Sequence, residues 1–106
     1  MLKTIHLDGK EVQLRATAAT PLFYKAQFKR DFFQDLSMMA NEKGEVDKKN
    51  IDITIFYNLF WVFAKNADRM IKEPIEYFSE FETFPIDVVA PVIKELLENS
   101  FQTKKK

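Results

Sequence analysis

The sequence predicts a mainly helical α+β protein, in which a small N-terminal β-hairpin packs on a body of four to five helices. Two observations carry this prediction. An Asp-Gly pair, Asp8 and Gly9, separates two short segments of alternating apolar and polar residues, which is a strong hairpin signal. Most of the remaining chain has apolar residues at helical spacing, and Pro21 and Pro74 stand where helices commonly begin.

Length and composition predict one domain. The chain has 106 residues, which is near the commonest domain size. Eleven Phe, three Tyr and one Trp supply ample side-chain volume for a core. We therefore expect a single compact domain over residues 1–106, made of a hairpin (2–16), a helical body (21–101) and a flexible tail (102–106).

Charge and residue usage argue against several kinds of function. The 16 Lys plus Arg residues balance 16 Asp plus Glu residues, so no net positive charge would attract nucleic acid or an anionic membrane. The longest apolar run, Leu59 to Ala64, is far shorter than the roughly 20 residues that span a bilayer. The N-terminus lacks a signal-peptide pattern, and the chain has no cysteine for a disulfide or a thiolate site. We expect a soluble, intracellular protein.

The two-residue loop sets the register of the hairpin. Ile5 then faces Val12, and Leu7 faces Lys10. This register places four apolar side chains on one face of the ribbon, those of Ile5, Leu7, Val12 and Leu14. Because an isolated hairpin is marginally stable in water, we expect this face to lie on the helices.

Thr20 and Pro21 predict the start of the first helix. Thr20 would be the N-cap, and Pro21 would take the first helical position, where its missing N–H is not needed. Seven apolar residues would share one side of this helix, namely Leu22, Ala26, Phe28, Phe32, Phe33, Leu36 and Met39.

Two lysines, Lys25 and Lys29, interrupt the apolar side of this first helix. Either their stems reach out to solvent, or the helix bends near residues 29–31 and resumes with a new phase. We favour the bend. Two aromatic residues, Phe23 and Tyr24, fall off the main apolar stripe. The charged stretch at 41–50 that follows the helix is expected to be a solvated, disordered loop.

Residues 51–72 predict the central helix of the core, because their apolar side chains cover an arc of roughly 200° around the axis. The arc consists of Ile53, Ile55, Phe56, Leu59, Phe60, Val62, Phe63, Ala67, Met70 and Ile71. Trp61 falls outside this arc, with Tyr57 to one side of it and Lys65 to the other. Either another part of the domain covers Trp61, as is usual for tryptophan, or this region is a partner surface that is partly exposed in the isolated protein.

Pro74 predicts a short helix through about Phe81, with Ile75 and Phe78 on the same side as Phe81. A long helix from about Ile86 to Phe101 would follow, and Pro91 would be tolerated near its first turn. This last helix would bury Val89, Val92, Ile93, Leu96 and Leu97.

An acidic stretch covers the two C-terminal helices. Seven acids lie between Glu73 and Glu98, with Lys94 as the single base. Such a stretch most often forms a solvated face, and less often a site for a basic partner.

Motifs for chemistry are scarce. The single histidine, His6, faces Glu11 on the polar side of the predicted hairpin, and two groups are too few for a zinc site. Two glycines, Gly9 and Gly44, cannot form a phosphate-binding loop. The serines have no second histidine to act as a base. We therefore expect no enzyme activity, no cofactor and no metal site.

Several segments share their pattern with a known family. The run from Trp61 to Asp68 is followed by Pro74-Ile75-Glu76-Tyr77-Phe78, then by Phe81-x-x-Phe84, Ile86-Asp87 and the helix from Pro91 to Leu97. The Asp-Gly hairpin agrees, as does the aromatic helix that holds Thr20-Pro21-Leu22, Tyr24, Phe28, Arg30-Asp31 and Leu36. In these features the chain resembles, over nearly its whole length, the tail assembly chaperones of long-tailed bacteriophages, mainly those of Gram-positive hosts. It departs at Lys29, where a small residue, often glycine, would be expected.

The resemblance implies a non-catalytic function in tail assembly. Such chaperones bind the tape-measure protein, bring tail-tube protein to it and leave before the tail is finished. We would then expect the protein in the host bacterial cytoplasm and not in the mature virion. Binding would need exposed apolar and aromatic surface, and the candidate residues are Trp61, Tyr57, Lys65, Phe23 and Tyr24. The alternative is a small structural connector or completion protein of a phage or prophage particle, which would stay in the virion.

Overall fold

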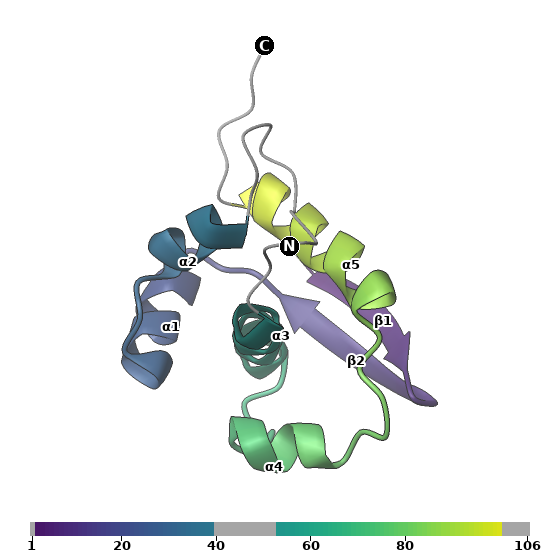
Figure 1. The fold of residues 1–106 in the computed structure, drawn as a ribbon. Coiled ribbons are helices and arrows are strands. Elements are labelled where there is room, and N and C mark those ends of the chain that lie inside the picture. Colours follow the sequence, from purple (N-terminus) through teal and green to yellow (C-terminus); the bar gives the residue numbers. More distant parts are fainter. Residues whose placement is uncertain (1, 40–52, 101–106) are drawn as a thin grey trace.

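A computed structural model describes residues 2–39 and 53–100 of the chain. It begins with an antiparallel hairpin of strands β1 (Leu2–Leu7) and β2 (Lys10–Arg15). Five helices follow in the described ranges: α1 (Thr20–Phe28), α2 (Phe32–Met39), α3 (Ile53–Ala67), α4 (Pro74–Ser79) and α5 (Ile86–Ser100). The structure confirms the mainly helical α+β fold with a small N-terminal hairpin (Figure 1).

The hairpin has the predicted register, with Ile5 opposite Val12. Both turn residues have positive φ, 56° at Asp8 and 76° at Gly9, as a type I′ turn requires. The predicted apolar face packs against the core, where Val12 is half-buried and the remaining three residues are buried: Ile5, Leu7 and Leu14.

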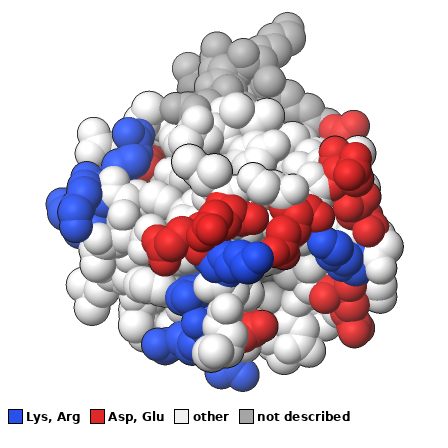
Figure 2. Space-filling view, turned by 90° about the horizontal axis from the view of Figure 1, so that it is seen from below, with Lys and Arg blue, Asp and Glu red and all other residues white. Residues whose placement is uncertain are grey.

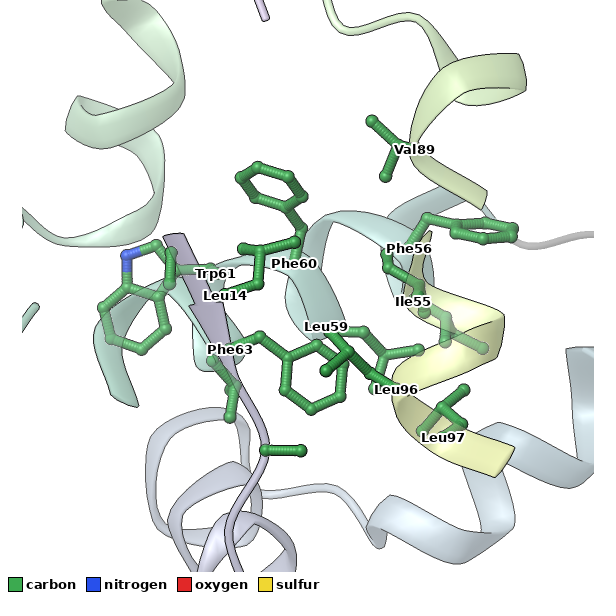
Figure 3. Packing of buried hydrophobic residues seen from close by; sticks show 14 of the residues in the cluster. Leu14, Ile55, Phe56, Leu59, Phe60, Trp61, Phe63, Val89, Leu96 and Leu97 are labelled. Carbon is green, nitrogen blue, oxygen red and sulfur yellow. The ribbon is translucent and has the colours of Figure 1, made fainter. Parts of the chain in front are cut away.

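Helix α3 occupies the centre of the molecule, as predicted. Figure 1 shows it nearly end-on, with α1 and α2 on one side, the hairpin and α5 on the other, and α4 below. It packs against β2, α1 and α5. A helix covered on several sides needs an apolar arc wider than that of a surface helix. Its buried residues are Ile55, Phe56, Leu59, Phe60, Trp61, Val62, Phe63 and Ala64, and Figure 3 shows most of them among side chains of β2 and α5.

The predicted bend near residues 29–31 is a complete break between two helices. Helix α1 ends at Phe28, and α2 begins at Phe32 in a new direction (Figure 1). Lys29 is left-handed, with a φ of 60°, and its N–H donates a 2.9 Å hydrogen bond to the carbonyl oxygen of Lys25. Glycine usually takes this position at a helix end, so Lys29 ends the helix in spite of its side chain.

This break overturns the single apolar stripe that was predicted for residues 22–39. Leu22 and Phe33 were expected to be buried, yet both are exposed, Leu22 at 75%. Tyr24, which was expected off the stripe, is fully buried. Because the two helices have different phases and directions, no single stripe can describe both.

Helix α1 begins one residue earlier than predicted. Ala19 is the N-cap, and Thr20 already belongs to the helix. Thr20 is buried, and its hydroxyl oxygen accepts hydrogen bonds from the Thr17 N–H at 3.0 Å and from Asn66 Nδ2 at 2.9 Å. The threonine therefore ties the start of α1 to α3 instead of capping its own helix.

Two helices are shorter than predicted. Helix α3 ends at Ala67, and the carboxylate of Asp68 accepts a 3.0 Å hydrogen bond from the Met70 N–H, a local turn that competes with helix continuation. Met70 is consequently 88% exposed, and Ile53 is exposed at the other end, so both leave the predicted arc. Helix α4 ends at Ser79 rather than near Phe81.

Helix α5 agrees with its prediction and holds Pro91 within its length. Val92 is half-buried, and the other predicted core residues are buried: Val89, Ile93, Leu96 and Leu97. The predicted loop at 41–50 and the predicted tail at 102–106 lie outside the described residues. In residues 2–39 and 53–100, no helix has the length and apolar character needed to cross a membrane.

Candidate functional site

Trp61 belongs to the core and not to an exposed partner surface. The residue is 1% exposed, and its indole N–H donates a 2.8 Å hydrogen bond to the carbonyl oxygen of Lys72. Its ring lies 6.0 Å from that of Phe23 and 5.9 Å from that of Phe28, between centroids. Of the two alternatives for Trp61, cover by another part of the domain is confirmed, and a partly exposed partner surface at this residue is wrong. The chain turns back after α3 and covers the indole, which the sequence pattern could not show.

Lys65 takes part in the same enclosure. Its ammonium group donates a 3.0 Å hydrogen bond to the carbonyl oxygen of Ile71 and lies 5.7 Å from the Trp61 ring centroid, within the range of a cation–π interaction. The i, i+4 spacing places Trp61 and Lys65 on one face of α3. Together they bind the carbonyl groups of two successive residues, Ile71 and Lys72. We call this arrangement the Trp61 clamp.

Tyr24 has a structural contact of its own. Its hydroxyl donates a 2.6 Å hydrogen bond to Asp35 Oδ2, and Arg30 donates two of 2.8 Å to the same carboxylate. Burial raises the pKa of Tyr24. Burial also acts to raise the pKa of Asp35, but the hydrogen bonds from Arg30 and Tyr24 outweigh it and hold that pKa below its usual value. The network joins α1 to α2 across their break, which removes Tyr24 from the candidate surface.

Tyr57 belongs to a second aromatic cluster on α3. Its half-buried ring lies 4.8 Å from that of Phe78 and 4.4 Å from that of Phe84, between centroids. Phe60 lies 5.1 Å from Phe84 and closes the cluster toward the core. Phe23, also half-buried, packs instead on Trp61. The five predicted site residues therefore do not form one surface, and Tyr57 is the one that borders an open groove.

This groove lies between α3 and α4. It has a volume of ≈ 440 Å³ and is lined by Tyr57, Asn58, Pro74, Ile75, Phe78 and Ser79. Ligand-binding clefts commonly measure about 300–1,000 Å³, so the α3–α4 groove is large enough to receive side chains of a partner. Ile75 on its wall is 83% exposed. The groove thus combines a packed aromatic floor with an apolar side chain that stands in solvent.

The α4 side of this groove was not predicted from the sequence. The spacing grouped Ile75 with Phe78 and Phe81 on one side of the helix, without showing whether that side is covered. In the structure Tyr77 is buried and fills the interior position. Ile75 lies about 200° from Tyr77 around a helix, so both cannot face the core. The large aromatic residue at 77 was the signal that could have placed Ile75 outside.

Acidic side chains surround α4. Figure 2 views the molecule from the α4 side and shows acidic residues across this face, with basic residues between and beside them and a broad uncharged area next to them. Residues 73–82 contribute four exposed carboxylates and no base, namely Glu73, Glu76, Glu80 and Glu82. Of these, Glu80 alone makes an ion pair within the described part of the chain, at 2.7 Å from Lys72. The exposure of these carboxylates agrees with both alternatives for the acidic stretch, a solvated face and a site for a basic partner.

A second cleft, of ≈ 340 Å³, lies between β2 and α4, where Tyr77 meets Asp68 and Glu80. Burial, followed by the charges of those two carboxylates, raises the pKa of Tyr77 to about 12. The hydroxyl is therefore protonated at neutral pH. His6 and Glu11 lie 3.9 Å apart on the exposed face of the hairpin. Among the residues that the structure describes, no cluster of three His, Cys, Asp or Glu side chains could hold a metal ion.

Comparisons of the chain with protein-family models, with curated proteins and with solved structures find no match. The candidate site therefore rests on the residues and their geometry. The α3–α4 groove differs from the second cleft because no charged side chain lines it and because Ile75 is exposed on its wall.

Proposed function

We propose that the protein is a non-catalytic tail assembly chaperone of a long-tailed bacteriophage or prophage. In this function it binds the tape-measure protein, the tail-tube protein or both during tail morphogenesis. The resemblance of its motifs to that family supports the proposal. One observation carries the binding part: the α3–α4 groove exposes Ile75 beside the half-buried rings of Tyr57 and Phe78.

A chaperone of this type must cover apolar segments reversibly, which requires apolar surface on a stable body. The floor of the groove is stable because the rings of Tyr57, Phe78 and Phe84 pack on one another at 4.4–5.2 Å between centroids. Ile75 can be desolvated by a partner without any change in this packing. A central apolar anchor surrounded by weaker contacts is the usual arrangement of an interface hot spot.

The proposal also specifies where the protein acts. It binds its partners in the host bacterial cytoplasm, before the tail is complete, and it is absent from the mature virion. It needs no nucleic acid, membrane or cofactor for this function.

Co-purification tests the proposal. The tagged chain is co-expressed with the tape-measure or the tail-tube protein encoded in the same genome, and the captured partner is quantified. Ile75→Glu should abolish capture, because a charge in an apolar groove is costly to desolvate. Leu22→Glu is the matched control, since Leu22 is 75% exposed on α1, and this variant should capture partner normally. Retained capture by Ile75→Glu, or an equal loss in both variants, contradicts binding through the groove.

Purified particles distinguish the chaperone from a structural connector. Mass spectrometry of mature virions should detect no copies of the chain if it leaves before completion. Its presence in a fixed copy number per particle would identify a connector and overturn the proposed function.

A further inference from the structure

We propose that the segment held in the α3–α4 groove is a basic amphipathic helix, with apolar anchors on one face and Lys or Arg residues beside them. This inference rests on the proposed binding function and specifies the chemistry of the partner.

The shape of the groove selects a helix. Helix α4 has six residues, so it is about 9 Å long at 1.5 Å per residue. That length matches about two turns of a partner helix, whose anchors would stand at i, i+3 or i+4, and i+7. An extended peptide instead gains its affinity from backbone hydrogen bonds to a sheet edge. The walls here are two helices and not a sheet edge, and in the 15-residue α3 the central backbone groups are bonded within the helix.

The lining of the groove selects apolar anchors. Tyr57, Ile75 and Phe78 provide the contact area, and the polar groups that line it are uncharged, those of Asn58 and Ser79. Ile75 is the most exposed of the three apolar residues. A leucine, isoleucine or methionine side chain on the partner would therefore lie between Ile75 and the aromatic floor.

The charges beside the groove favour a partner helix that carries Lys or Arg residues next to its apolar anchors. Glu73 and Glu76 flank the lining residues Pro74 and Ile75, and neither makes an ion pair within residues 2–39 and 53–100. The carboxylate of Glu73 accepts a 3.1 Å hydrogen bond from Gln27 Nε2, a neutral group that orients the charge without cancelling it.

Lys72 is the base next to Glu73 and Glu76 in the sequence, and its ammonium group is bonded to Glu80 at 2.7 Å. The charge of Glu76 acts on Lys72, whose pKa it helps to raise after the larger effect of Glu80. A lysine or arginine of the partner would gain a charge-assisted contact at Glu73 or Glu76. A partner helix with Asp or Glu residues in those positions would meet like charges and would bind less tightly.

Two synthetic helical peptides of about 18 residues, or five turns, test this inference. They share the same leucine positions, and one carries lysine where the other carries glutamate. Calorimetric titration of the full chain should give binding of the lysine peptide at least about 10-fold tighter than that of the glutamate peptide. The difference should shrink as NaCl is raised from about 0.05 to 1 M, because salt screens exposed charges.

Variants of the chain separate the two parts of the inference. Glu73→Gln/Glu76→Gln should weaken the lysine peptide about 3- to 10-fold. The matched control Glu11→Gln/Glu98→Gln removes the same charge at carboxylates that lie 3.9 Å from His6 and from Lys94, respectively, and it should leave affinity unchanged. Ile75→Ser should weaken binding at least about 10-fold, while Leu22→Ser should not.

Three results would overturn the proposed partner chemistry: equal binding of the two peptides, no binding of either, or equal losses in the Glu73/Glu76 variant and its control. Each can be told apart from failure of the proposed function, because capture of the tape-measure or tail-tube protein, and its loss in Ile75→Glu, is measured without these peptides.

Discussion

The two aromatic clusters of α3 begin one helical turn apart, at Tyr57 and Trp61, yet one is open and the other is closed. Residues after α3 fold over Trp61, and the Lys72 carbonyl accepts its indole N–H at 2.8 Å. Tyr57 packs on Phe78 and Phe84 but still borders the α3–α4 groove. A buried aromatic residue with a polar atom needs a partner for that atom, and the backbone of the returning chain supplies it at Trp61.

The closed cluster at Trp61 also determines where the groove lies. The Trp61 clamp holds the carbonyl groups of Ile71 and Lys72, and α4 begins two residues later at Pro74. The rotation of this short helix is set by Tyr77, which is buried. Ile75 is thereby turned toward solvent beside Tyr57. The closed cluster thus positions the open one.

The largest effect should come from opening the closed cluster. Trp61→Ala should lower the free energy of unfolding by about 3–5 kcal/mol, since it leaves a large cavity. The thermal midpoint should fall by roughly 12 °C or more. Circular dichroism and urea unfolding measure both quantities. An unchanged midpoint combined with lost partner binding would restore Trp61 as a contact residue and contradict the clamp.

Removing the carboxylate that joins α1 to α2 should have the next largest effect. Asp35→Asn should cost about 2 kcal/mol, because Arg30 and Tyr24 lose a charged acceptor in a buried position. The folded pKa of Asp35 lies below its unfolded value. Its stabilisation is therefore fully present above the unfolded pKa of about 3.9 and is lost as pH falls through the folded pKa.

Urea unfolding of wild type and Asp35→Asn between pH 7 and pH 2 measures this dependence. The difference between the two proteins should be constant down to about pH 5 and should shrink at lower pH. A difference that stays constant to pH 2, or that grows with acid, would show that the carboxylate is not stabilised by its partners.

A change at the open cluster should affect stability much less. Ile75→Glu should leave the free energy of unfolding within about 0.5 kcal/mol of wild type, because the side chain is solvated in the free protein. Urea unfolding is compared with Leu22→Glu, which places the same charge at another exposed apolar residue. A loss as large as that of Asp35→Asn would mean that Ile75 packs in the folded core and that the groove is not an open surface.

The smallest effect is expected at the side chain of Lys72. The Trp61 indole is bonded to the backbone of Lys72, while the Lys72 ammonium group makes an exposed ion pair with Glu80. Lys72→Met should therefore leave the thermal midpoint unchanged within error, at both low and high salt. A marked fall in the midpoint would indicate that the ion pair, and not the backbone carbonyl, closes the chain over Trp61.

Local features were predictable from the sequence. The Asp8-Gly9 turn determines the hairpin register, Lys25 and Lys29 indicated the break between α1 and α2, and the wide apolar arc of residues 51–72 indicated a central helix. Each of these depends on residues that are close together in the chain. The candidate site was predicted only in part, since Tyr57 borders the groove whereas Ile75 and Phe78 were not among the predicted site residues.

The sequence by itself determined which side chains share a face of a helix or strand, because backbone geometry fixes that spacing. Only the tertiary structure decided which faces are covered. Trp61 and Ile75 are both apolar residues on helices, and they differ because a returning segment covers one and leaves the other in solvent. Coverage depends on where residues far along the chain pack, and helical periodicity carries no information about that.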